Sequence, residues 1–249
     1  MDDLRFWKRD IIFEHHQQTQ RPMQMDEIKA LLLSLRDEPY AEFQRKLLPN
    51  VTPERIVGVR TPALRAMAKE LWRNGMARGF MAQLPHATFE ENQLHAFAIA
   101  EVRDFATCLS ATERFLPHVD NWATSDQLLP RCFGQHTTAL LPAVEHWIAH
   151  SHEYTVRFGM GMLLKHYLEA HFETRLLELV ARVRRDEYYI RMMQAWYFAE
   201  ALAKQPTATL PYIEQLRLTP WTHNKAIQKA TESRRIGAEM KQRLRSLRV

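Results

Sequence analysis

Apolar residues recur at helical spacing along most of this chain, and this periodicity restricts the possible folds more than any other feature. In residues 61–72, Leu64, Ala68 and Leu71 lie on one face of a helix, and Met67 extends the same stripe. Gly75 follows directly after this segment, as is common at a helix end. No stretch sustains the alternation of apolar and polar residues that a half-buried strand requires. The pattern therefore predicts a protein built from helices.

The same reasoning predicts helices along the rest of the chain. Thr88 is suited to cap a helix that carries Glu90 and Glu91 in its first turn, where the helix dipole favours acidic groups. The other predicted helices cover residues 26–35, 111–116, 122–132, 138–149, 154–170, 172–184, 188–204, 210–216, 224–233 and 238–247. Residues 1–24 are polar and interrupted by Pro22. We expect them to form an N-terminal arm that precedes a helical-repeat domain over residues 25–249.

Paired helices joined by short turns recur roughly every 35–45 residues without exact repetition, as in HEAT or armadillo proteins. This spacing favours an all-α solenoid of antiparallel helix pairs, and a helical bundle is the alternative. Solenoids curve, and their concave face commonly binds an extended partner.

Composition excludes several other classes of protein. Apolar residues make up 46% of the 249 positions and charged residues 25%, as in ordinary soluble domains. No apolar run approaches the ~18 residues of a membrane span, and the N-terminus lacks the apolar segment of a secretion signal. We therefore expect a cytoplasmic protein without membrane association, and a monomer by default.

Neither the histidines nor the cysteines form a recognisable metal motif. His146 and His150 are one helical turn apart, but they lack the intervening glutamate of a zinc-protease motif and any cysteine cluster. Cys108 and Cys132 belong to no paired-thiol motif, so we interpret both as small, reduced core residues. No metal and no cofactor is expected.

The net charge of +5 is unevenly distributed. The last 33 residues contain nine Lys and Arg against two Glu, a net charge of +7, whereas the preceding 216 residues carry −2. A basic end on a nearly neutral body indicates a polyanionic partner, with nucleic acid the first candidate. A solvated terminal helix is the alternative.

Trp122 and Asp126 are the most informative single pair of residues. If they are helical, a spacing of four places the indole and the carboxylate on one face, one turn apart. Such a pair can hold a sugar or a cationic group beside a stabilising negative charge. A half-buried tryptophan beside a surface aspartate is the alternative interpretation.

Five stretches, taken together and in this order, resemble the DNA alkylation repair family of AlkD-like HEAT-repeat DNA glycosylases. They cover roughly residues 25–249 and comprise Val57-Gly58-Val59-Arg60-Thr61-Pro62 with Arg65, Asp120-Asn121-Trp122 with Asp126, Val156-Arg157-Phe158-Gly159, Tyr188-Tyr189-Ile190 with Trp196, and His223 through Lys229 followed by Glu232-Ser233-Arg234. The resemblance implies a HEAT-like fold with a basic concave face and duplex DNA, alkylated or structured, as partner.

The resemblance also implies roles for particular residues. Trp122 and Trp196 match the two tryptophans that flank the sugar of the damaged nucleotide, and Asp126 matches the catalytic carboxylate between them. Arg157 matches an arginine that holds the backbone phosphate. The basic C-terminal stretch, which includes Lys225, Lys229, Arg234 and Arg235, corresponds to the repeat that lies along the duplex.

These residue types suit the removal of N3- or N7-alkylated purines. An alkylated purine is cationic, so its glycosidic bond is already weak and positive charge develops on the deoxyribose as the bond breaks. A nearby carboxylate stabilises that charge and can orient the attacking water. Two indole faces add cation–π attraction, and an arginine fork anchors the phosphate without reading the base.

One segment departs from the family pattern. Glycosylase members usually carry a short DNA-contacting helix, with a pattern similar to Met-x-x-Tyr-Met-Lys, just before the Gly-x-x-Thr-Pro stretch. Here Pro49 and Pro53 predict a turn or broken linker over residues 47–56. The departure resembles a subgroup of the family that lacks the DNA-contacting element.

Three functions are consistent with the sequence. The first is an alkylpurine DNA glycosylase, the second a DNA-binding relative with little or no glycosylase activity, and the third a protein-interaction scaffold, a common use of α-solenoids.

Overall fold

The computed structural model describes residues 25–249, which form fourteen α-helices and three short 3-10 helices without any strand. The predicted N-terminal arm, residues 1–24, lies outside the described residues. The helices of the first half are α2 (Met25–Ser34), α3 (Glu38–Leu47), α4 (Thr61–Arg73), α5 (Ala77–Ala82), α6 (Phe89–Ala100), α7 (Phe105–Phe115) and α8 (Trp122–Gln127). Those of the second half are α9 (Thr137–Ile148), α10 (Glu153–His166), α11 (Thr174–Ala181), α12 (Tyr188–Lys204), α13 (Pro206–Glu214), α14 (Pro220–Glu232) and α15 (Ala238–Ser246). The 3-10 helices are η1 (Pro53–Arg55), η2 (Leu116–His118) and η3 (Arg131–Gln135).

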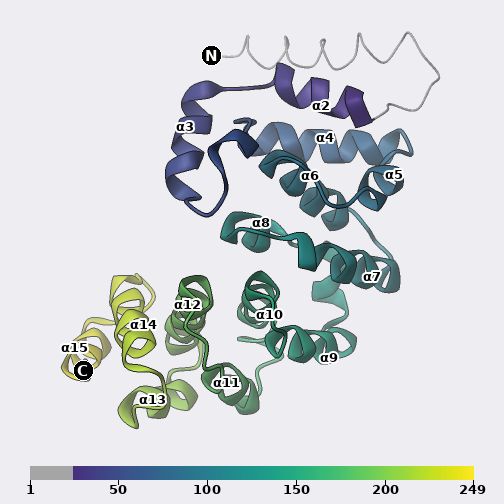
Figure 1. The fold of residues 1–249 in the computed structure, drawn as a ribbon. Coiled ribbons are helices and arrows are strands. Elements are labelled where there is room, and N and C mark those ends of the chain that lie inside the picture. The colour runs from purple at the N-terminus through teal and green to yellow at the C-terminus, as the bar shows by residue number, and fades with distance from the viewer. Residues whose placement is uncertain (1–24) are drawn as a thin grey trace.

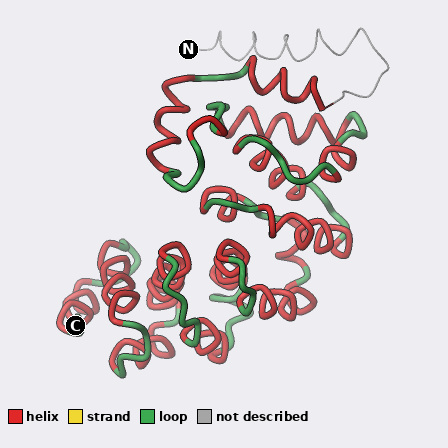
Figure 2. Tube along the Cα trace, viewed as in Figure 1, coloured by secondary structure: helices red, strands yellow, loops and turns green. Residues whose placement is uncertain are grey.

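The helices follow a curved path in two layers, as the predicted all-α solenoid requires (Figures 1 and 2). Helices α10, α12 and α14 stand side by side, and α9, α11 and α13 form a second layer, which lies below them in the view (Figure 1). The strongest packing joins α12 to α14, α10 to α12, α9 to α10 and α4 to α6. Because successive helix pairs along the chain share one apolar core, each pair is stabilised by its neighbours.

Helix α6 is the centre of the first half, and all of its residues are buried. Thr88 caps it in a capping box with Glu91, as the sequence predicts. The polar side chains on α6 need partners because burial removes them from water. Gln93 donates to the Thr124 hydroxyl at 3.0 Å, which ties α6 to α8.

Most predicted helices are present, but α7, α13 and α14 begin four to six residues before their predicted starts, and α10 ends four residues before its predicted end. Residues 188–204 form α12 over the predicted range, and α4 extends only one residue beyond residues 61–72. The prediction of one helix over residues 122–132 is wrong, because α8 ends at Gln127 and η3 begins at Arg131. Pro130 explains the break, since proline lacks an N–H donor and disfavours helical geometry in the residue before it.

Helices α3 and α5 do not appear among the predicted helices. Helix α3 has only Ala41 buried, so it lacks the apolar stripe by which the others were predicted. Its stability comes from Asp37, whose side chain accepts a hydrogen bond from the Tyr40 N–H, and from the ion pair between Glu38 and Arg45. Helix α5 has six residues, too few to establish a period.

Close packing explains one of the two glycines in α10. A Cβ added at Gly159 would lie 2.9 Å from Ile148 Cγ1 and 3.1 Å from the Ile148 nitrogen, so α9 approaches too closely for a side chain. The same explanation does not extend to Gly161, where an added Cβ would meet only the flexible end of Met193 at 3.7 Å.

Three further predictions concern residues away from the candidate site. Cys108 and Cys132 are both free and buried, as predicted. His146 is exposed and His150 half-buried at the end of α9, and residues 25–249 contain no group of three or more potential ligands arranged for a metal ion. Within the same residues, no helix is long and apolar enough to cross a membrane.

Candidate active site

Helix α8 brings Trp122 and Asp126 together as its first and fifth residues. Asn121 fixes the start of the helix, because its side-chain oxygen accepts a hydrogen bond from the Thr124 N–H at 2.8 Å. The spacing of four therefore has the helical geometry that the sequence suggests, with indole and carboxylate one turn apart. Trp122 is half-buried, and the Asp126 side chain retains 20% of its exposure.

Asp126 is held by a two-pronged ion pair with Arg157 of α10. Arg157 donates from Nε to Oδ1 at 2.8 Å and from Nη2 to Oδ2 at 2.7 Å. Its Nη1 donates to the Tyr189 carbonyl at 2.8 Å, which ties the pair to the first turn of α12. Arg157 is only 4% exposed. The carboxylate is therefore fixed in one orientation by a rigid, planar partner.

Two N–H groups of Arg157 remain free to donate hydrogen bonds. A guanidinium carries five N–H groups, and three of them are used by Asp126 and the Tyr189 carbonyl. One hydrogen remains on each terminal nitrogen. A phosphate oxygen could use these two groups without breaking the ion pair, provided that it reaches this largely buried side chain.

A second carboxylate lies one turn before Arg157. Glu153 accepts a hydrogen bond from the Tyr189 N–H at 3.3 Å, and its burial raises the pKa of this carboxyl above the usual range. Burial also raises the pKa of the neighbouring Tyr154 and Tyr189 hydroxyls. The surroundings of Arg157 are thus partly shielded from water, which strengthens local electrostatic interactions.

Trp196 lies on α12 and is 38% exposed, so it is a surface tryptophan. Ala199 and Leu202, further along the same helix, are buried and belong to the side of α12 that faces the core. Trp196 follows Tyr189 by seven residues, or about two helical turns, and therefore lies on the same side of the helix as Tyr189. An exposed indole on this side is available to a ligand.

The four basic residues expected to contact DNA lie on α14 and in the loop after it. Lys225 and Lys229 are one turn apart on α14, and the Lys225 ammonium donates to Gln228 at 2.9 Å. Arg234 and Arg235 are both exposed. Arg235 pairs with Glu200 of α12, so part of its charge is already neutralised.

The segment of residues 47–56 packs against the beginning of α8. The Trp122 indole N–H donates to the Leu47 carbonyl at 3.1 Å. Asn50 donates to the Asp120 carbonyl at 2.6 Å and to the Tyr154 hydroxyl at 2.7 Å. The prediction of a turn or broken linker is confirmed, with only the three-residue η1 as regular structure between α3 and α4. This segment covers one edge of Trp122.

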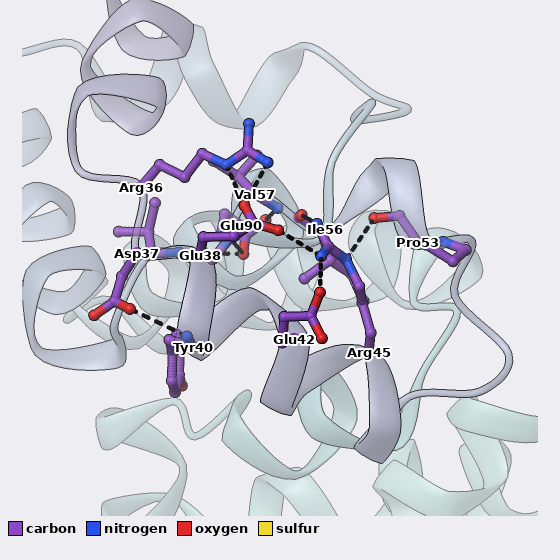
Figure 3. Close-up of polar contacts among 12 residues, drawn as sticks. Arg36, Asp37, Glu38, Tyr40, Glu42, Arg45, Pro53, Ile56, Val57 and Glu90 are labelled. Atoms are coloured by element: carbon purple, nitrogen blue, oxygen red, sulfur yellow. Dashed lines mark hydrogen bonds and ion pairs between the residues drawn. The ribbon is translucent and has the colours of Figure 1, made fainter.

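Two charged residues fix the position of this segment (Figure 3). The Glu90 carboxylate is fully buried and accepts hydrogen bonds from the N–H groups of Val57 at 2.9 Å and Gly58 at 2.7 Å. Arg45 of α3 reaches across to the carbonyls of Pro53 and Ile56. The second half of the segment and the residues that follow it are therefore tied to α3 and α6.

Several residues around the site are not among the site residues predicted from the sequence. Arg55 donates to the Asp120 carboxylate at 2.5 Å and to the Ala87 carbonyl at 2.9 Å, and with Asn50 it connects the 47–56 segment to α8. Asp120 stands two residues before Trp122, which is a local signal, but its partners are 65 and 70 positions away. No periodicity or motif could have paired them.

Comparison with known proteins identifies the family. No individual curated protein matches the chain. The family model described as DNA alkylation repair enzyme matches residues 28–230, which include Trp122, Asp126, Arg157 and Trp196. The chain therefore belongs to the DNA alkylation repair enzyme family, which gives it a role in DNA repair with DNA as its partner.

Proposed function

We propose that this protein is a DNA glycosylase that binds duplex DNA and hydrolyses the N-glycosidic bond of N3- and N7-alkylated purines. Asp126 is the catalytic carboxylate, and Trp122 and Trp196 position the sugar of the damaged nucleotide. The base leaves as a neutral purine because the alkyl group already makes it cationic, so the reaction needs no strong acid and no metal or cofactor.

The observation that carries this proposal is the orientation of Asp126. A carboxylate lowers the barrier to bond cleavage only if it is held where positive charge develops on the deoxyribose. The bidentate pair with the buried Arg157 fixes Asp126, while the remaining exposure of its side chain leaves it accessible. The positive charge of Arg157 offsets part of the negative charge of Asp126 and so does not itself stabilise the developing positive charge. The main contribution of Arg157 is therefore to hold Asp126 in position.

Positive charge for the DNA backbone is provided by α14 and the following loop. Lys225, Lys229 and Arg234 are available there, whereas Arg235 would exchange its bond with Glu200 for a phosphate. Contacts of this kind set affinity and orientation but do not read the sequence.

A DNA-binding protein with little or no glycosylase activity is the second candidate. The arrangement of residues 47–56 favours it, because this segment occupies the edge of Trp122 with an irregular chain in place of a helix. A protein-interaction scaffold is the third candidate, and in that case the basic end would be only a solvated surface.

Release of 7-methylguanine from duplex DNA distinguishes the first two candidates. The wild type should release the base, Asp126→Asn should not, and Asp26→Asn, a matched change at an exposed position on α2, should behave as wild type. If neither the wild type nor the variants release base, the glycosylase proposal is wrong.

A salt titration of binding to undamaged duplex tests the third candidate. For a DNA-binding protein, log Kd should rise with log salt concentration with a slope of about 0.9 for each phosphate contacted. Binding that is absent, or that does not change with salt, would contradict both DNA-dependent candidates.

A further inference from the structure

A cluster of aromatic and basic side chains lies beside the candidate active site, and only one of its members, Lys225, has a role in the proposed function, as a contact for the DNA backbone. It consists of Tyr188 and Arg191 on the first turn of α12 and Trp221 and Lys225 on the first turns of α14. These two helices pack side by side (Figure 1). The Tyr188 and Trp221 rings meet edge to face, with centroids 5.9 Å apart.

Trp221 gathers two positive charges. The Arg191 guanidinium carbon lies 4.9 Å from the centroid of the Trp221 ring, and the Lys225 ammonium nitrogen lies 5.9 Å from it. Both distances allow cation–π attraction. The Trp221 indole is therefore in contact with two cationic side chains, one from α12 and one from α14.

Arg191 is poorly satisfied by the protein. Its Nε is buried and has no hydrogen-bond partner among the described residues. Its contact with the Asp186 carboxylate is 4.0 Å long, and that carboxylate is fully exposed. Because the Arg191 side chain is 28% exposed, an anion from solvent can pair with its guanidinium more closely than Asp186 does.

Tyr188 presents its ring to solvent. The side chain belongs to the large exposed hydrophobic groups, with 52% of the residue accessible, even though it lies among other aromatic rings. The Tyr189 ring lies 5.2 Å away, and the Tyr189 carbonyl accepts the hydrogen bond from Arg157. The exposed ring is thus connected to the candidate active site through a single residue.

We propose that Tyr188, Arg191, Trp221 and Lys225 form a second nucleotide subsite, which binds one unpaired nucleotide of a DNA strand. Its phosphate binds between Arg191 and Lys225, and its base stacks on the exposed Tyr188 ring. Trp221 is a positioning residue that holds the two cations. Cations alone would be enough for a duplex backbone, whereas an exposed ring beside them matches the open face of an unpaired base.

This inference rests on the proposed DNA binding and extends it to a substrate that contains a single-stranded portion. The test compares two probes of equal duplex length, one blunt and one with a short single-stranded tail, in binding titrations at fixed salt. Stacking of one base is expected to favour the tailed probe about tenfold in the wild type.

The variants isolate the aromatic ring. Tyr188→Ala should reduce the preference for the tailed probe to about one, whereas Tyr188→Phe should retain it because the ring remains. Phe43→Ala is the matched control, because Phe43 on α3 is 54% exposed and lies outside the cluster. A fluorescent base analogue in the tail should be quenched by the wild type and not by Tyr188→Ala.

The outcomes separate this inference from the proposed function. Equal affinity of the wild type for both probes, or a preference that survives in Tyr188→Ala, would overturn the subsite while leaving duplex binding intact. Failure to bind the blunt probe, together with tail binding that depends on Tyr188, would support the subsite and contradict the duplex proposal. Loss of the preference in Phe43→Ala would also overturn the assignment to Tyr188.

Discussion

Removing the Asp126 carboxylate should destabilise the fold, because it would leave Arg157 charged and buried. In Asp126→Ala the guanidinium keeps its bond to the Tyr189 carbonyl and loses both bonds to the carboxylate. Breaking a buried ion pair by deleting one partner typically costs about 3–5 kcal/mol. Since the Asp126 side chain is 20% exposed, water can reach the vacated position, and we expect the lower end, about 3 kcal/mol.

The measurement is urea unfolding followed by far-UV circular dichroism, with thermal unfolding as a second observable. For a chain of 249 residues, a loss of about 3 kcal/mol corresponds to a decrease in Tm of roughly 6 °C. Asp126→Asn keeps the shape and one acceptor oxygen, so it should lose less stability and remain suitable for activity assays.

A double-mutant cycle tests the physical reason for this loss. Arg157→Met removes the buried charge and leaves Asp126 partly solvated. The double variant should therefore be more stable than Asp126→Ala alone. The conclusion that the ion pair between Asp126 and Arg157 stabilises the fold would be refuted by either of two results. One is a cost below about 1 kcal/mol for Asp126→Ala, and the other is that the costs of the two single variants simply add in the double variant.

Two further predictions concern the first half of the fold. Gly58→Ala should cost at least about 2 kcal/mol of unfolding free energy, because φ is +94° and an added Cβ would lie 2.6 Å from the Asp37 carbonyl oxygen. Gly79→Ala is the control, because Gly79 lies in open space on α5 and its replacement should be neutral or stabilising. Equal unfolding free energies for the two variants would contradict this prediction. Burial lowers the pKa of His86 to about 4 and that of His95 to about 2, and each falls below the unfolded value of 6.5. The unfolded chain then binds more protons, so stability should fall as pH decreases from 6.5 towards 4. Between pH 7 and pH 5 the loss is about 2 kcal/mol for each histidine. Urea titrations at the two pH values should show a smaller loss in the double variant His86→Gln/His95→Gln, and an equal loss would contradict the assignment.

The sequence was sufficient to predict the helical class because most helices bury an apolar stripe. Helix α4 has a proline in its first turn, a glycine just after its end and an apolar stripe between them. Helix α12 has many apolar residues over its 17 positions. Helix α3 has no such stripe and is stabilised by capping and ion pairs. The break at Pro130 was a local signal that the predicted helix over residues 122–132 did not take into account.

At the candidate site, too, some features could be predicted from the sequence and others could not. Resemblance to a family was enough to select Asp126 and Arg157 as separate residues, but not to predict that they bind each other across 31 positions. The contacts of Asn50 and Arg55 with Asp120 also join distant segments, and their geometry depends on how α3 and α8 pack. Such contacts arise from tertiary structure and leave no period in the sequence.

The most direct test of the central claim is the single-turnover rate of 7-methylguanine release from duplex DNA at saturating protein. If Asp126 stabilises the developing positive charge, Asp126→Asn should be slower by about 10²–10³-fold, as is typical for one well-placed group. Its affinity for the same duplex should remain near that of the wild type. Equal release rates for the two proteins, or no release by the wild type despite tight and salt-dependent binding, would contradict the glycosylase proposal.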